Sequence, residues 1–116
     1  ERITIDFFRD TKLGNKMSNL EYDCSEGECT ISVNGTFNAL LLGTWNELVQ
    51  KDKNEINRIQ IDFSDCEEID NSGLALLFIL KEKMGGDESR IELINVNEEI
   101  KRAFAVAEFH QLFHIV

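Results

Sequence analysis

The sequence predicts one α/β domain built around a mostly parallel sheet. The chain has 116 residues, close to the modal size of a single domain, and hydrophobic residues make up 42% of it, which is enough for a core. From residue 29 onward, segments with the two-residue periodicity of strands alternate with segments of helical periodicity. This alternation implies crossover connections between parallel strands.

The N-terminal third is expected to supply strands. Ile3, Ile5 and Phe7 alternate with polar residues, as on a strand with one buried face. Further along, Asn34-Gly35 is expected to end or bend a strand. In order, we predict a strand at 3–7, a loop at 11–19, a short strand at 20–22, a turn at 25–28 and a strand at 29–33.

An amphipathic helix is predicted to follow, with Asn38 as its N-cap. Its apolar positions recur at three and four residues, which gives one buried stripe. Trp45 lies on that stripe and is interpreted as a core residue. The stripe consists of Leu41, Leu42, Trp45, Leu48 and Val49, and the polar run 50–54 ends the helix.

The second half predicts two further strand-helix units. The segment 72–84 is apolar nearly all round and stops at Gly85-Gly86, so we expect a helix buried on most sides. Asn97 is expected to cap the last helix. In order, we predict a strand at 59–63, an acidic connection at 64–71, the helix at 72–84, a strand at 91–96, a helix with Ile100, Ala103, Phe104 and Ala107 inside, and a short strand or packed coil at 112–116.

The charge balance excludes some partners. The formal net charge of −10 argues against nucleic acid and against an anionic membrane surface, because both attract Lys and Arg. It serves either solubility or recognition of a basic protein. We find no apolar run of ~20 residues and no signal-peptide pattern, so we expect no direct membrane insertion. Since the first residue is Glu1, the sequence is consistent with a fragment of a longer chain.

The cysteines and histidines predict neither a disulfide scaffold nor a metal site. Three cysteines fit a reducing compartment, so the expected localisation is cytoplasmic. Cys24 and Cys29, with His110 and His114, have the spacing of a zinc site, but we interpret them as core thiols and surface histidines. We predict no metal, no cofactor and no catalytic residue.

The stretch CEEIDNSGLALLF places one small alcohol, Ser72, between acidic and apolar residues. Ser72 or Asn71 could cap the helix that follows. Alternatively, Ser72 accepts a phosphate, which the free N–H groups of a helix start tolerate. Gly73 would then leave the hydroxyl uncovered. The surrounding acids, which a phosphate would make still more negative, are Asp62, Asp65, Glu67, Glu68 and Asp70.

The run IDNSGLALL, preceded by IQIDFSDCEE, resembles the signature of the STAS domain, the domain of anti-sigma-factor antagonists and of sulfate-transporter tails. VNGTFN, NVNEEIKRAF and HQLFHIV extend the resemblance from about residue 29 to residue 115. The resemblance implies a single domain at 20–116 with helices mainly on one face of a mixed, mostly parallel sheet.

The family resemblance also implies a function. It implies a regulatory protein, not an enzyme, that binds an anti-sigma factor/serine kinase while Ser72 is unphosphorylated and is restored by a PP2C-type phosphatase. Asp70 stands at the acidic position of the motif. The partner-binding residues expected on this basis are Asn38, Asp70, Asn71, Ser72, Gly73 and Leu74.

Two departures from the family pattern stand out. Asn38 replaces the acidic residue that usually ends an upstream Gly-x-x-Asp, so this position carries no charge. The N-terminal stretch, about residues 1–17, is longer than the family usually shows. We predict that residues 1–19 form an extension or edge strand, or an arm that makes a homodimer.

Two other functions stay open from the sequence. The chain could be a STAS accessory subunit or domain of a lipid or anion transporter, because the apolar runs at 40–48 and 74–77 suit either branch. It could also be a ligand-sensing module, which requires basic or aromatic residues around a pocket. The sequence does not locate such residues.

Overall fold

The computed structural model describes residues 2–6, 19–50, 56–86 and 90–116. Most of the loop expected at 11–19 and of the polar run at 50–54 lies outside these ranges. The described elements are β1 (Arg2–Asp6), β2 (Asn19–Ser25), β3 (Glu28–Phe37), the 3-10 turn η2 (Ala39–Leu41), α1 (Leu42–Val49), β4 (Arg58–Asp62), β5 (Cys66–Ile69), α2 (Asn71–Lys83), β6 (Ile91–Ile94), α3 (Glu98–Val106), the 3-10 turn η5 (Phe109–Gln111) and β7 (His114–Ile115).

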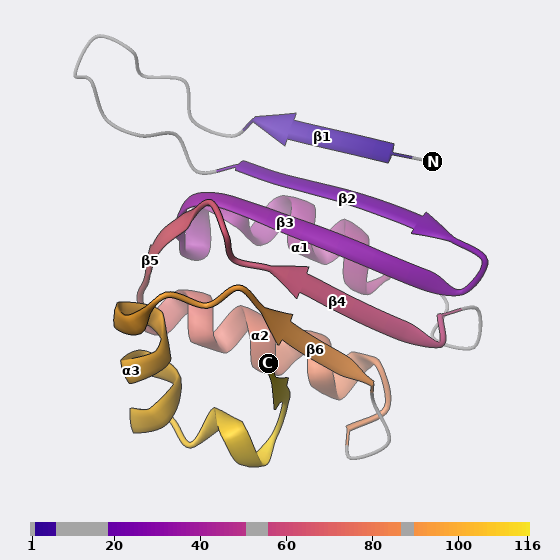
Figure 1. The fold of residues 1–116 in the computed structure, drawn as a ribbon. Helices are drawn as coiled ribbons and strands as arrows, with labels where there is room; N and C mark the ends of the chain where they lie inside the picture. Colours follow the sequence, from indigo (N-terminus) through magenta and orange to yellow (C-terminus); the bar gives the residue numbers. More distant parts are fainter. Residues whose placement is uncertain (1, 7–18, 51–55, 87–89) are drawn as a thin grey trace, which may run out of the picture.

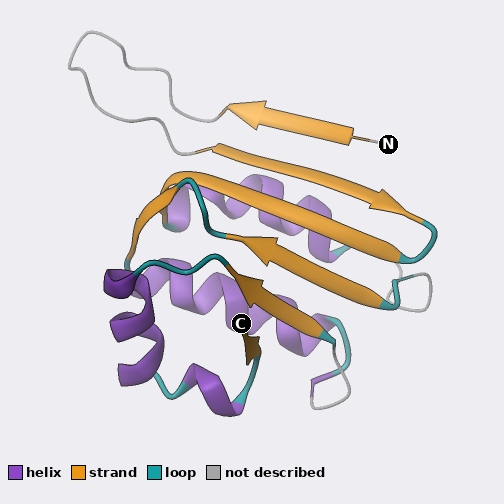
Figure 2. Cartoon of the chain, in the orientation of Figure 1, coloured by secondary structure: helices purple, strands orange, loops and turns teal. Residues whose placement is uncertain are grey.

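The strands form one mixed sheet in the order β1-β2-β3-β4-β6-β7, and β5 pairs separately with β3. β1, β2 and β3 are antiparallel, whereas β3, β4, β5, β6 and β7 pair in parallel. α1 and α2 lie behind the sheet in Figure 1, and Figure 2 shows the same division into a helical and a strand layer. The predicted α/β class is confirmed. No helix in the described part of the chain is long and apolar enough to cross a bilayer.

β5 corrects the prediction of a plain acidic connection at 64–71. Its residues pair in parallel with the end of β3, with Phe37 opposite Ile69. β3 does not end at Asn34-Gly35 but bends there, since the register shifts between Gly35 and Thr36. The bend lets one strand pair with β4 along its first half and with β5 at its end.

The core lies between the sheet and the helices and contains a continuous row of aromatic rings. Trp45 is fully buried, as predicted, and its ring centroid lies 5.2 Å from that of Phe37. Its indole Nε1 also donates a hydrogen bond of 2.5 Å to the carbonyl of Leu76 on α2. The row runs from Trp45 through Phe37, Phe63, Phe104 and Phe109 to Phe113, with neighbouring centroids between 5.1 and 6.0 Å apart. The C-terminal aromatic residues, whose burial the sequence left open, are therefore packed.

α2 is less completely buried than its composition predicts. Phe78 is 46% exposed and Ile79 is 37% exposed, because the outer side of the helix faces solvent. Conversely, Lys81 is buried, with its ammonium donating to the carbonyl of Gly86 at 2.9 Å and lying 5.8 Å from the centroid of the Phe113 ring. The hydrogen bond and the ring face compensate for the loss of water around this charge.

The structure also contradicts the interpretation of the cysteines as core thiols. Cys24 and Cys29 face each other across the β2–β3 hairpin and form a disulfide, whereas Cys66 is a buried free thiol. Spacing in the sequence could not show this, because the bond depends on the register that Gly27 and the turn impose. A bonded pair also offers no thiolates to a metal.

We predict that reduction of this disulfide lowers the free energy of unfolding by about 2 kcal/mol without loss of the fold. The closed loop is short, and the paired residues of β2 and β3 hold the hairpin together in both states. Urea denaturation with and without a phosphine reductant, followed by far-UV circular dichroism, measures the change. The double variant Cys24→Ala/Cys29→Ala should not respond to the reductant. Loss of the native spectrum on reduction would contradict the prediction.

Candidate functional site

The candidate site lies at the carboxyl ends of β3 and β5. Because these strands are parallel neighbours, the loops that follow them leave the sheet side by side. The amide of Asp70 donates to the carbonyl of Phe37 at 3.3 Å, which joins the two loops at their base. The sheet thus brings the segment after Phe37 and the start of α2 together.

Asp70 caps α2, and Ser72 connects that cap to the neighbouring loop. Asp70 Oδ1 accepts the amide hydrogen of Gly73 at 2.9 Å and the hydroxyl hydrogen of Ser72 at 2.6 Å. Ser72 Oγ in turn accepts the amide hydrogen of Ala39 at 2.8 Å. Neither Ser72 nor Asn71 is the N-cap that the sequence suggested, since the helix begins at Asn71 with Asp70 before it.

Asn38 caps the second loop, as predicted. Its Oδ1 accepts the amide hydrogen of Leu40 at 2.9 Å and so starts the turn η2 that leads into α1. The next amide, that of Ala39, is the donor to Ser72. One half-exposed hydroxyl therefore ties the starts of two helical segments together, and we call Asp70, Ser72 and Ala39 the hydroxyl bridge.

Gly73 is required for a different reason from the one inferred from the sequence. It is buried, and a Cβ placed on it would lie 2.2 Å from the carbonyl oxygen of Phe37 and 2.8 Å from Ile69 Cγ1. The missing side chain lets α2 approach β3, and this approach places the hydroxyl of Ser72 over the loop at Ala39.

We predict that Gly73→Ala lowers the free energy of unfolding by about 3 kcal/mol, because the new methyl group overlaps backbone atoms that cannot yield. The matched control is Gly43→Ala, at an exposed position of α1, which should raise stability by about 0.5–1 kcal/mol. Urea denaturation of both variants measures the difference. Equal stabilities of the two variants would refute the proposed close approach.

The segment that leads to Ser72 is acidic. Asp65, Glu67, Glu68 and Asp70 are all exposed, as the sequence indicated. Asp62 is partly enclosed, where burial raises its pKa, but hydrogen bonds from Asn95 and Ser64 outweigh this effect and leave the pKa below its ordinary value. Asp70, which contacts Ser72 directly, disfavours further negative charge at the site at neutral pH.

Large apolar side chains are exposed on the helical segments, and the sequence did not predict their exposure. They come from η2, α1 and α2, and each is more than one third exposed. We define the apolar surface by Leu40 (49% exposed), Leu42 (43%), Phe78 (46%) and Ile79 (37%). Exposed large apolar side chains of this kind are candidates for contact with a partner.

Cys66 lies at the start of β5, below this site. Burial raises the pKa of its thiol to about 11, and its S–H donates to the carbonyl of Glu68 at 3.4 Å. The Asn97 side chain, which caps α3, donates to the carbonyl of Cys66 at 3.1 Å. The thiol thus belongs to the support of the site and is poorly suited to act as a nucleophile.

We predict that Cys66 resists alkylation in the folded protein. With a pKa of about 11, its thiolate fraction at pH 8 is about 0.1%, against roughly a quarter for an ordinary cysteine. Reduced protein treated with iodoacetamide at pH 8 should label at Cys24, which is half-exposed, long before Cys66. Peptide mass spectrometry measures both sites, with urea-unfolded protein as the control. Equal labelling of both cysteines in the native state would contradict the burial of Cys66.

The structure brings most of the predicted site residues together. Asn38, Asp70, Asn71 and Ser72 lie around the hydroxyl bridge, whereas Gly73 is buried beneath it and Leu74 packs half-buried against the core. Within the described residues, no group of three or more His, Cys, Asp and Glu side chains could hold a metal ion.

Comparison with known proteins identifies relatives of this arrangement. Residues 20–116 match a family described as "Mlab, STAS domain". A STAS-domain containing protein of Pseudomonas aeruginosa (strain UCBPP-PA14) is 27% identical over 88 residues, which cover 76% of this chain and 87% of the relative.

Solved structures share the fold at lower identity. A putative anti-sigma factor antagonist from Thermotoga maritima has a TM-score of 0.69 at 19% identity and covers 81% of this chain and 82% of its own. The unphosphorylated form of the anti-sigma factor antagonist SpoIIAA has a TM-score of 0.66 at 13% identity, covering 84% and 86%. The phosphorylated form of Bacillus SpoIIAA also has a TM-score of 0.66, at 12% identity, covering 84% and 90%.

Proposed function

The chain belongs to the STAS domain family, and we propose that it is a regulatory binding protein of the anti-sigma-factor-antagonist type, switched by phosphorylation of Ser72. It acts by binding and not by catalysis. Its partner is an anti-sigma factor that is also a serine kinase, and a PP2C-type phosphatase reverses the modification in the cytoplasm. The existence of SpoIIAA structures in unphosphorylated and phosphorylated forms with the same fold supports this proposal.

The hydroxyl bridge is the observation that carries the proposal. Ser72 Oγ has one hydrogen to donate, and it donates it to Asp70. A phosphoryl group on Oγ replaces that hydrogen and brings about −1.5 to −2 charges to a carboxylate now 2.6 Å from Oγ. The repulsion breaks the contact with Asp70, and the Ala39 amide then faces a charged phosphate in place of a neutral hydroxyl, so modification alters both loops while the core stays packed.

The surface around the bridge defines the partner's chemistry. The proposed contact residues are Asn38, Asp70, Asn71, Ser72 and Leu74, with Gly73 acting through the close approach of α2 to β3. The apolar surface and the exposed carboxylates of β5 complete the proposed contact face. A partner with an apolar patch bordered by Lys or Arg therefore fits the unmodified state.

We predict that the cognate anti-sigma kinase transfers one phosphate from ATP to Ser72. Intact-mass measurement counts the phosphates, and tandem mass spectrometry locates them. Ser72→Ala should stay unmodified, whereas Ser64→Ala, in the nearby exposed turn before β5, should be modified like the wild type. No phosphate, or phosphate only at another serine, would overturn the switch.

The same kinase serves as the partner in a binding experiment. We predict that Ser72→Asp raises the dissociation constant at least tenfold relative to wild type, about 1.4 kcal/mol, because it places a second carboxylate beside Asp70. The charge-matched control Ser64→Asp should bind within about twofold of wild type. Biolayer interferometry measures the affinities, and thermal unfolding confirms that the variants fold.

Equal binding by Ser72→Asp and Ser72→Ala would refute the phosphorylation switch. Docking through the apolar surface is tested separately by Phe78→Ser, an exposed change expected to weaken partner binding. If Phe78→Ser abolishes binding while Ser72→Asp and Ser72→Ala both bind like wild type, the apolar surface binds its partner regardless of phosphorylation. This result would favour a transporter accessory subunit.

A further inference from the structure

A second polar site lies at the opposite ends of the parallel strands. A hollow of about 400 Å³ opens where β4 and β6 begin, whereas Ser72 stands where β3 and β5 end. It draws side chains from β4, β6 and the C-terminal segment. Its lining residues are Arg58, Arg90, Ile91, Glu92, Leu112 and His114.

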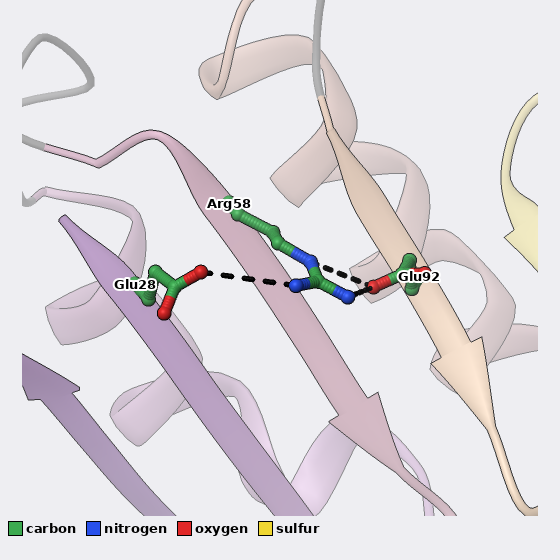
Figure 3. A network of polar contacts seen from close by, with 3 residues as sticks. All are labelled: Glu28, Arg58 and Glu92. Carbon is green, nitrogen blue, oxygen red and sulfur yellow. Dashed lines mark hydrogen bonds and ion pairs between the residues drawn. The ribbon is translucent and has the colours of Figure 1, made fainter.

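Neighbouring carboxylates hold Arg58 in position. Its Nε donates to Glu92 Oε1 at 2.8 Å, one of its terminal nitrogens contacts the same oxygen, and the other lies 3.7 Å from Glu28 Oε1. Figure 3 shows the guanidinium lying across the strands between the two carboxylates. The hydrogen bond with Glu92 raises the pKa of Arg58, so this group stays charged and oriented.

Arg90 lies beside Arg58 without a carboxylate of its own. Ile59 pairs with Ile91, so the two arginines stand next to each other at the amino ends of neighbouring strands. Arg90 is exposed, and its side chain has no hydrogen bond or ion pair with the described residues. Two adjacent cations repel each other, and an anion between them would remove that repulsion.

The remaining walls suit an organic ligand. Glu92 pairs with His114 across β6 and β7, which brings an exposed imidazole to the rim. Ile91 and Leu112 supply apolar surface. The two arginines and the carboxylates Glu28 and Glu92 sum to no net charge, so the arrangement offers an anion the unpaired donors of Arg90 rather than a surplus of positive charge. It therefore favours a single anionic group and disfavours a polyanion such as nucleic acid.

We propose that this hollow binds a small organic anion with one phosphate or carboxylate group. The anionic group lies against Arg90, beside the guanidinium of Arg58 that Glu92 and Glu28 hold in place, and the body of the ligand contacts Leu112 and Ile91. The site is far along the strands from Ser72, so the proposal does not depend on the phosphorylation switch. A ligand-sensing module requires basic residues around a pocket. The hollow supplies them in Arg58 and Arg90, which the sequence alone did not bring together.

Amide NMR titration tests the proposal with four probes at low ionic strength: phenyl phosphate, benzoate, inorganic phosphate and neutral benzyl alcohol. We expect saturable shifts at Arg58, Arg90 and His114 with phenyl phosphate or benzoate, with a dissociation constant of about 1 mM. Stronger binding of one of these two distinguishes phosphate from carboxylate as the preferred group. Inorganic phosphate should bind more weakly, because it has no apolar body.

Two arginine variants separate a site from general charge. Arg90→Gln should weaken binding about tenfold, whereas Arg102→Gln, an equal loss of charge at an exposed position of α3, should leave it unchanged. Ser72→Ala should also bind like wild type. Absence of saturable shifts, equal binding of benzyl alcohol, or equal losses in the two arginine variants would overturn the proposal.

Discussion

The close approach of α2 to β3 at Gly73 determines the geometry of the rest of the candidate site. The carbonyl of Phe37 occupies the space that a side chain on residue 73 would need. The same carbonyl accepts the amide of Asp70, which fixes the cap of α2 directly over the end of β3. With the cap in this place, Ser72 accepts the amide hydrogen of Ala39, so a chemical change at this one hydroxyl alters the contacts of two loops.

The pairing of β5 with β3 is the sheet's contribution to this geometry, and it explains a feature of the core. Phe37 ends β3 at the site and also stacks in the aromatic row between Trp45 and Phe63. Trp45 in turn donates to the Leu76 carbonyl of α2. The residues that support the hydroxyl bridge are thus packed against large rigid rings. A chemical change at Ser72 is therefore expected to alter the conformation of the exposed loops and not that of the interior.

Sequence reasoning located the serine, the α/β class and most strands, because alternating Ile and Val residues and the DNSGL motif are local signals. It missed β5 because CEEI has two successive acids and pairs only at the bent end of β3. It overestimated the burial of Phe78 and Ile79, since an apolar helix does not reveal which of its sides lacks a neighbour. The Cys24–Cys29 bond and the hollow at Arg90 depend on strand register, which no single segment encodes.

The directions of the parallel strands have a consequence for how the domain can be used. The strands β3, β4, β5, β6 and β7 all run in the same direction. The site at Ser72 and the hollow at Arg90 therefore lie at opposite ends of the parallel strands. A large protein bound around Ser72 would leave the hollow at Arg58 and Arg90 open to small molecules. The architecture therefore suits a domain with two independent inputs, the proposed modification of Ser72 and the proposed binding of a small anion at Arg90.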